Sequence, residues 1–268
     1  MRPNKVLLFF AALNLFAAAC ITGNPLQPTP AAAPTEALTI TPSPTRTAIP
    51  SPLPAYPTGE SIPLWVTDFA DPILAEVADR KPDFEDDFSR NRGWLNMMPG
   101  LVWPLYAERY DGMLFLRLPE GTKDSILYNS RINRRNFVLT LEFRFVHNQP
   151  DDAVRFQFSQ PPDQSIAFDF SNNRNWKFQW GSENNLQSTA GIYDHFPPER
   201  IPLTIIMNGT QCAVYLNNDP LTYLSNCRIN PLHESAVTFR LLGDNGSDVT
   251  ANFDNLNLWD LDNIPNLP

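Results

Sequence analysis

The chain has 268 residues, a formal net charge of −9 and an aromatic content of 12%. An acidic chain without a basic run is poorly suited to bind phosphates, so nucleic acid is not expected as a partner. Three histidines and three cysteines leave little material for a zinc-type centre, so no metal ligands are predicted. The 27 prolines indicate that part of the chain is not globular.

The first twenty residues have the features of an export signal. Arg2 and Lys5 precede a largely apolar run over 6–19, which spans about 21 Å as a helix against about 30 Å for a bilayer core. Three alanines then precede Cys20. The stretch resembles a bacterial lipoprotein signal, which implies that Cys20 is lipidated and anchors the protein to the outer face of a bacterial membrane. Cleavage after Ala19 and secretion is the alternative.

The cysteines favour lipidation. If Cys20 carries lipid, Cys212 and Cys227 are left to pair with each other, whereas an unlipidated Cys20 leaves an odd thiol in an oxidising compartment. Cys212 and Cys227 flank the turn at 217–220 almost symmetrically, so an antiparallel hairpin brings them close. We predict a disulfide between them, with two separately buried thiols as the alternative.

A linker and a short helix are expected before the folded domain. Residues 21–63 hold eleven prolines, eight threonines and three charged residues. Proline fixes φ and removes backbone donors, so this stretch is predicted to be a disordered spacer. In the lead-in over 64–83, Asp71 is the predicted N-cap of a helix with Pro72 at its first position, ending near Arg80.

From Phe84 onward the apolar residues alternate with a period of two, as in half-buried strands. Strands are predicted over 137–145, 154–158, 166–170, 176–180, 203–207, 212–216, 236–242 and 252–259. Asp111-Gly112 and Asn208-Gly209 are hairpin signals. With no long helical period, residues 84–262 are predicted to form an antiparallel β-sandwich in an all-β fold, followed by a tail over 263–268.

Several segments resemble the concanavalin A-like (laminin G-like) jelly roll. They are Asp86-Asp87-Phe88-Ser89 with Gly93-Trp94, Tyr110-Asp111-Gly112, the late hairpin Tyr215–Leu221, and the closing strand Phe253–Trp259. The resemblance spans about residues 84–262. It implies the fold, but it leaves the function open, since this sandwich hosts lectins, glycanases and adhesion modules alike.

Strand alternation also predicts a polar face. With the phenylalanines and tryptophans inward, one outer face is expected to gather Glu142, Arg144, Arg155, Gln157, Asp169, Lys177 and Gln179. The resemblance makes this the ligand-facing sheet; an ordinary solvated face is the alternative. Tyr193 and His195 lie in a predicted loop and are further candidates for ligand recognition.

The acidic residues do not follow a catalytic pattern. The glucanase relatives in this fold carry a Glu-x-Asp-x-x-Glu strand, which is absent here, so only a cross-strand pair of Glu142 and Asp169 is available for catalysis. Residues 244–248 superficially resemble a calcium loop but lack the distal glutamate of an EF-hand, and turn chemistry also explains them. No cofactor is predicted, with structural calcium as an alternative.

Three functions follow. The leading hypothesis is a lipid-anchored, non-catalytic extracellular module that binds carbohydrate or another cell-envelope ligand. The second is a glycoside-processing hydrolase resembling 3-keto-disaccharide hydrolases, which requires Glu142 and Asp169 to converge. The third is a purely structural envelope lipoprotein.

Overall fold

The computed structural model describes residues 62–96, 106–122, 124–160, 164–182, 184–195, 199–228, 230, 232–265 and 267. The predicted signal, Cys20 and the linker up to residue 61 lie outside the described residues. Within the described part, no helix is both long and apolar enough to cross a membrane.

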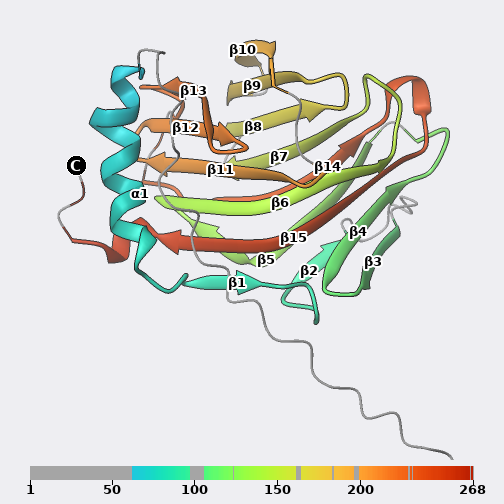
Figure 1. The fold of residues 1–268 in the computed structure, drawn as a ribbon, viewed down its shortest axis with the longest axis horizontal. Coiled ribbons are helices and arrows are strands. Elements are labelled where there is room, and N and C mark those ends of the chain that lie inside the picture. Colours follow the sequence, from blue (N-terminus) through green and yellow to red (C-terminus); the bar gives the residue numbers. More distant parts are fainter. Residues whose placement is uncertain are drawn as a thin grey trace, which may run out of the picture. The chain divides into compact units, whose positions relative to one another are not determined.

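Two antiparallel sheets pack face to face as a β-sandwich, which confirms the predicted fold class (Figure 1). Sheet A has the order β13 (Asp219–Leu224), β12 (Gln211–Leu216), β11 (Ile201–Asn208), β6 (Phe137–His147), β15 (Val249–Asp260), β4 (Met113–Leu118), β3 (Tyr106–Tyr110), with β1 (Phe84–Asp86) paired to β15. Sheet B has the order β10 (Asn185–Ile192), β9 (Asn175–Ser182), β8 (Gln164–Ser171), β7 (Ala153–Gln160), β14 (Ser235–Leu242), β5 (Asp124–Arg134), β2 (Trp94–Asn96).

The main core lies between the sheets and is rich in phenylalanine. Inward residues of β6 such as Leu141 and Phe143 meet inward residues of sheet B such as Phe156 and Phe170. All eight predicted strands are present, and both hairpin signals lie in tight turns, since Asp111 and Gly209 have positive φ. The alternation therefore sorts inward from outward side chains within each strand.

A second, smaller core lies on the outer face of sheet A. The helix α1 (Asp71–Ala78) crosses the ends of β12, β11, β6 and β15 (Figure 1). Its Ile73 and Val77 pack with Val138 and Trp259, and the Trp259 indole donates a hydrogen bond to the Arg80 carbonyl at 2.9 Å. The predicted N-cap at Asp71 is wrong. A π-helical turn, η1 (Val66–Ala70), runs directly into α1, and its Phe69 and Ala70 are buried in the same cluster.

The segment 86–94, which carries part of the family resemblance, is organised around one buried carboxylate. Asp86 is 1% exposed and accepts hydrogen bonds from the Trp94 indole and from the backbone N–H of Phe88, both at 2.8 Å. Phe88 has φ of 53° and inserts its ring into the main core. Burial raises the pKa of Asp86, although both hydrogen bonds oppose that shift.

The predicted disulfide joins Cys212 to Cys227, with their Cα atoms 6.0 Å apart. It links β12 to the chain just after β13. Within this hairpin Cys212 lies opposite Leu224. The chain beyond β13 returns toward β12, since the Cys227 N–H donates to the Thr210 carbonyl at 2.9 Å.

Candidate functional site: the polar face of sheet B

Five of the residues predicted to share a face lie on the outer face of sheet B. The cross-strand register places Arg155 opposite Asp169, and Asp169 opposite Lys177. Gln157 and Gln179 both lie opposite Ala167 on β8. Their inward neighbours, among them Phe156 and Phe178, belong to the main core, so the five side chains point away from it.

Arg155 is the centre of this face. Its Nε and Nη2 donate to the two carboxylate oxygens of Asp169 at 2.6 and 2.7 Å, and Nη2 also donates to Gln179 Oε1 at 3.0 Å. The side chains of Arg155 and Asp169 are only 22% and 13% exposed. A bidentate, charge-assisted pair of this kind fixes both side chains in one geometry.

The same network extends to β14 through Arg240, which the sequence analysis did not select. Arg240 lies opposite Arg155 and donates to Gln157 Oε1 at 2.8 Å, while Gln157 donates to Ser159 at 3.1 Å. Burial lowers the pKa of Arg240. The sequence could have identified Arg240, because Phe239 points inward and the next side chain along the strand must then point outward. We use "polar face" for Arg155, Gln157, Asp169, Lys177, Gln179 and Arg240.

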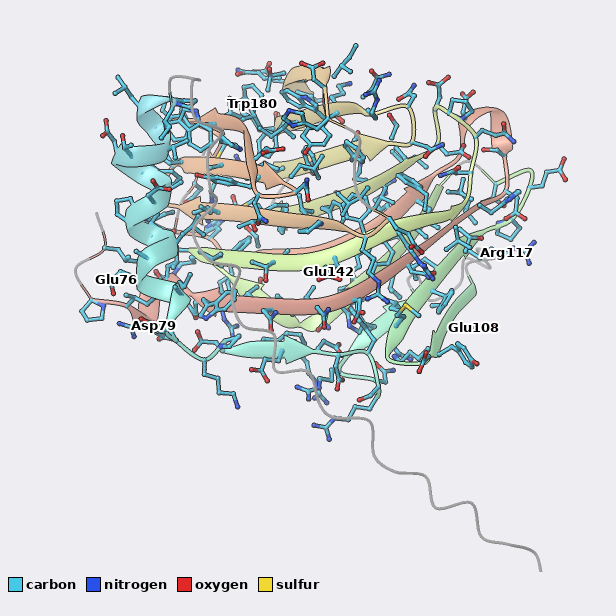
Figure 2. All side chains as sticks on the ribbon, in the orientation of Figure 1. Glu76, Asp79, Glu108, Arg117, Glu142 and Trp180 are labelled. Atoms are coloured by element: carbon cyan, nitrogen blue, oxygen red, sulfur yellow. A yellow bond between two sulfur atoms is a disulfide. The ribbon has the colours of Figure 1, made fainter. Side chains whose placement is uncertain are left out.

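Glu142 and Arg144 do not belong to this face, so the prediction that all seven residues share one surface is wrong. Glu142 projects from β6 in sheet A (Figure 2), and β6 pairs with β11 and β15 rather than with β7. The segment between β6 and β7 carries the chain from one sheet to the other. Alternation within a strand specifies the direction of each side chain but not the sheet to which the strand belongs.

The predicted catalytic pair is therefore also wrong. Glu142 points outward from sheet A and Asp169 points outward from sheet B, so the main core lies between the two carboxylates. A pair that shares one glycosidic bond needs a separation below about 10 Å on one surface. These two acids have no common substrate position.

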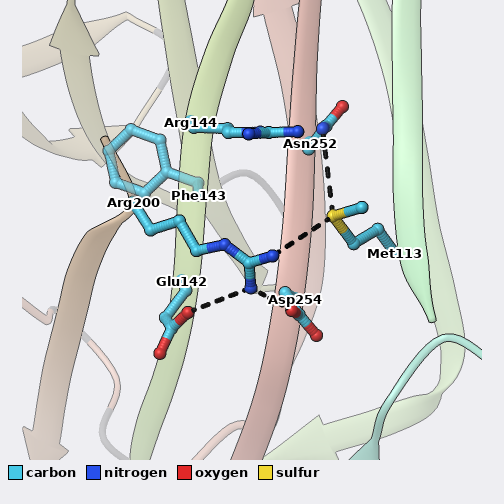
Figure 3. Close-up of a pocket in the computed structure, with 7 residues that line it drawn as sticks. All are labelled: Met113, Glu142, Phe143, Arg144, Arg200, Asn252 and Asp254. Carbon is cyan, nitrogen blue, oxygen red and sulfur yellow. Dashed lines mark hydrogen bonds and ion pairs between the residues drawn. The ribbon is translucent and has the colours of Figure 1, made fainter. Parts of the chain in front are cut away.

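Glu142 and Arg144 instead line a shallow depression on sheet A (Figure 3). Arg200 lies between two carboxylates there, with Nη1 2.6 Å from Asp254 Oδ2 and 3.6 Å from Glu142 Oε2. Arg144 donates to Glu199 at 2.6 Å. Both carboxylates that line this depression are therefore paired with an arginine.

Tyr193 and His195 follow β10 and converge on Asp219 at the β12–β13 hairpin. The Tyr193 hydroxyl donates to Asp219 Oδ2 at 2.5 Å, and His195 Nδ1 lies 2.9 Å from the same oxygen. Burial, and secondarily the bond to this carboxylate, raise the pKa of Tyr193. Tyr193 is only 4% exposed, so it joins the two sheets as a core residue, whereas His195 stays exposed.

The segment considered for calcium is organised by protein groups. The buried carboxylate of Asp152 accepts from the Asp244 N–H at 2.8 Å and from the Ser247 hydroxyl. Asp248 pairs with Arg117 at 2.7 Å. Among the described residues, no group of three or more histidines, cysteines or acidic residues is placed to hold a metal ion.

The architecture is similar to that of solved glycan-acting enzymes. A GlcNAcα1-4Gal releasing endo-β-galactosidase from Clostridium perfringens has a TM-score of 0.55 at 10% identity, over 78% of this chain and 65% of that chain. A β-1,3-1,4-glucanase (lichenase) derived from a mouse hindgut metagenome has a TM-score of 0.52 at 13% identity, over 66% of this chain and 98% of that chain. A Bacillus licheniformis β-glucanase has a TM-score of 0.52 at 9% identity, over 68% and 100%.

These similarities identify the fold as the concanavalin A-like jelly-roll β-sandwich, which confirms the resemblance seen in the sequence. The chain spans about two thirds of the length of the endo-β-galactosidase, and identities near 10% carry the fold alone. A scan against protein-family models finds no match. A search of the curated proteins finds none either.

Proposed function

We propose that this protein is a carbohydrate-binding module that recognises its ligand through the polar face of sheet B. The observation that carries the proposal is the fixed network of Arg155, Asp169 and Gln179 across three adjacent strands. Sugars are recognised by a few fixed donors and acceptors, and side chains held in place before binding lose little entropy when the ligand arrives. The fold supports the proposal, because the similar structures are named as a galactosidase and glucanases.

We further propose that the module is non-catalytic. Within the polar face as defined, Asp169 is the one carboxylate, and both of its oxygens accept hydrogen bonds from Arg155. Glycoside hydrolysis needs a second carboxyl group and a proton donor. On sheet A, the carboxylates of Glu142 and Asp254 are both within ion-pair distance of Arg200, which leaves neither of them free of a protein partner.

The proposal includes export and a lipid anchor at Cys20. The disulfide supports an oxidising compartment, because such bonds persist outside the cytosol. The proline-rich stretch up to residue 63 then acts as a spacer that holds the module away from the membrane. Plain secretion of the same module is the alternative, and mass spectrometry of the mature N-terminus distinguishes them by the presence of a diacylated cysteine.

Calorimetric titration of the full chain with soluble β-1,3-1,4-glucan and with GlcNAcα1-4Gal tests the function, after a glycan array has ranked further oligosaccharides. Gln179→Ala removes one acceptor and leaves the Arg155–Asp169 pair intact, so it is expected to weaken binding about tenfold without loss of fold. Glu142→Gln, on the other sheet, is the matched control and should bind normally.

Absence of binding to every glycan by the folded protein refutes the carbohydrate ligand. Equal losses in Gln179→Ala and Glu142→Gln refute the assignment to sheet B. Release of reducing ends from a bound glycan refutes the non-catalytic proposal.

A further inference from the structure

One edge of sheet B is an open template for strand pairing. The edge strand β10 has eight residues and pairs in unbroken register with β9 on one side; no described strand pairs with its other side. It contains no charged residue and no proline. Edge strands with these properties join other strands unless a protein blocks them.

The other sheet edges are short, charged or covered. On β13, Pro220 and a register irregularity interrupt the ladder, and Trp65 stacks on Tyr223 with ring centroids 5.6 Å apart. β3 has five residues, including Glu108 and Arg109, and β2 has only three. Among the described edge strands, β10 alone is neither short, charged nor covered.

The exposed side chains of β10 have a symmetric arrangement. Leu186 and Ile192 are 52% and 62% exposed, and both lie on the outer face of the sheet, three residues before and after Thr189. In an antiparallel pair of two β10 strands centred on Thr189, each Leu186 lies directly opposite Ile192 of the other copy. Directly opposed side chains have Cβ atoms about 5 Å apart, so both apolar pairs leave water.

The residues between these two are compatible with the same register. Ser188 of one copy faces Ala190 of the other, and both side chains are small and uncharged. Gln187 faces Gly191, whose lack of a side chain is required because the Trp176 ring lies against it. The arrangement has no clash of charge or bulk, and it is closed, because two-fold symmetry uses the same strand on both partners.

We propose that the protein forms a homodimer in which two β10 strands pair antiparallel about Thr189. The dimer joins two seven-stranded sheets into one continuous sheet. A two-fold axis perpendicular to the sheet keeps both outer faces on the same side, so the two polar faces lie side by side. A ligand with repeating units then meets two binding surfaces, which raises its apparent affinity.

Analytical ultracentrifugation of the full chain in detergent tests the dimer. The wild-type protein is expected to sediment as a species that contains two chains. The double variant Ser188→Lys/Ala190→Lys places lysines opposite each other at exposed positions and should raise the dimer dissociation constant at least about tenfold. The variant Ser188→Glu/Ala190→Glu should do the same, and an equimolar mixture of the two should restore dimers.

The control Ser225→Lys/Asn226→Lys adds the same charge at exposed positions of the turn that follows β13 and should dimerise normally. Oxidative cross-linking tests the register with Leu186→Cys and Ile192→Cys. A mixture of these two variants should form a cross-linked dimer, whereas each alone should not exceed the background of the wild-type protein. A wild-type chain that stays monomeric overturns the proposal. So does a lysine variant that dimerises normally, or cross-linking that is no stronger in the mixture than in either cysteine variant alone.

Discussion

Reduction of the Cys212–Cys227 disulfide should destabilise the fold by about 3 kcal/mol. The bond closes a loop with a sequence separation of 15, and restricting the unfolded chain over such a loop corresponds to about 3 kcal/mol at 25 °C. The folded geometry should survive, because hydrogen bonds from Thr210 to Ser225 and from Cys227 to Thr210 hold the same segment. About 3 kcal/mol is a large share of the net stability of a typical domain.

The measurement is guanidinium unfolding of the oxidised protein and of the same protein in reductant. No side chain changes between the two samples, so packing losses do not enter the difference. The melting temperature should fall by about 6 to 12 °C for a domain of this size. Cys20→Ser should respond to reductant like the wild type, because the predicted effect belongs to the hairpin. Equal unfolding free energies with and without reductant would refute the reasoning that the covalent loop stabilises the fold.

The remaining predictions concern Asp86 and Gly191. Asp86→Ala leaves the Trp94 indole and the Phe88 N–H without their acceptor. It should lower the unfolding free energy, measured by urea titration, by about 2 to 4 kcal/mol. A loss below about 0.5 kcal/mol contradicts the hydrogen bonds described. Because burial raises the pKa of Asp86 above 3.8, its contribution to stability is full below pH 3.8 and declines as pH rises through the folded-state value. Asp86→Asn should remove that pH dependence, and an unchanged slope in unfolding free energy against pH contradicts it. Gly191→Ala places a Cβ 2.9 Å from the Trp176 ring and should cost about 1 to 3 kcal/mol in thermal unfolding, whereas unchanged stability means that the ring is free to move.

Much of the sandwich was predictable because its strands are half-buried. In β6, β7 and β8 large apolar residues, many of them phenylalanine, recur at every second position, so both the strands and the direction of their side chains follow from the sequence. β10 was missed for the opposite reason. Asn185–Ile192 is exposed along nearly its whole length, so no face needs apolar residues and no alternation marks it.

Two features were predicted wrongly from the sequence, the sheet that holds Glu142 and the start of the helix, and each error has a physical cause. The sheet that holds Glu142 depends on the path of the chain between β6 and β7, which the periodicity of the strands does not record. The start of the helical lead-in depends on Phe69 and Ala70 docking on sheet A, a tertiary contact that extends the helix beyond the capping signal at Asp71.

The position of α1 determines how the folded domain responds to mechanical tension. A pull transmitted through Ile62 first reaches η1 and α1, whose contacts belong to the small cluster on the outer face of sheet A and not to the core between the sheets. Because that cluster is separate from the core between the sheets, detachment of this helix should leave the strand ladders and the polar face in place. We therefore expect the helix to yield before the sandwich when the N-terminal end of the folded domain is pulled.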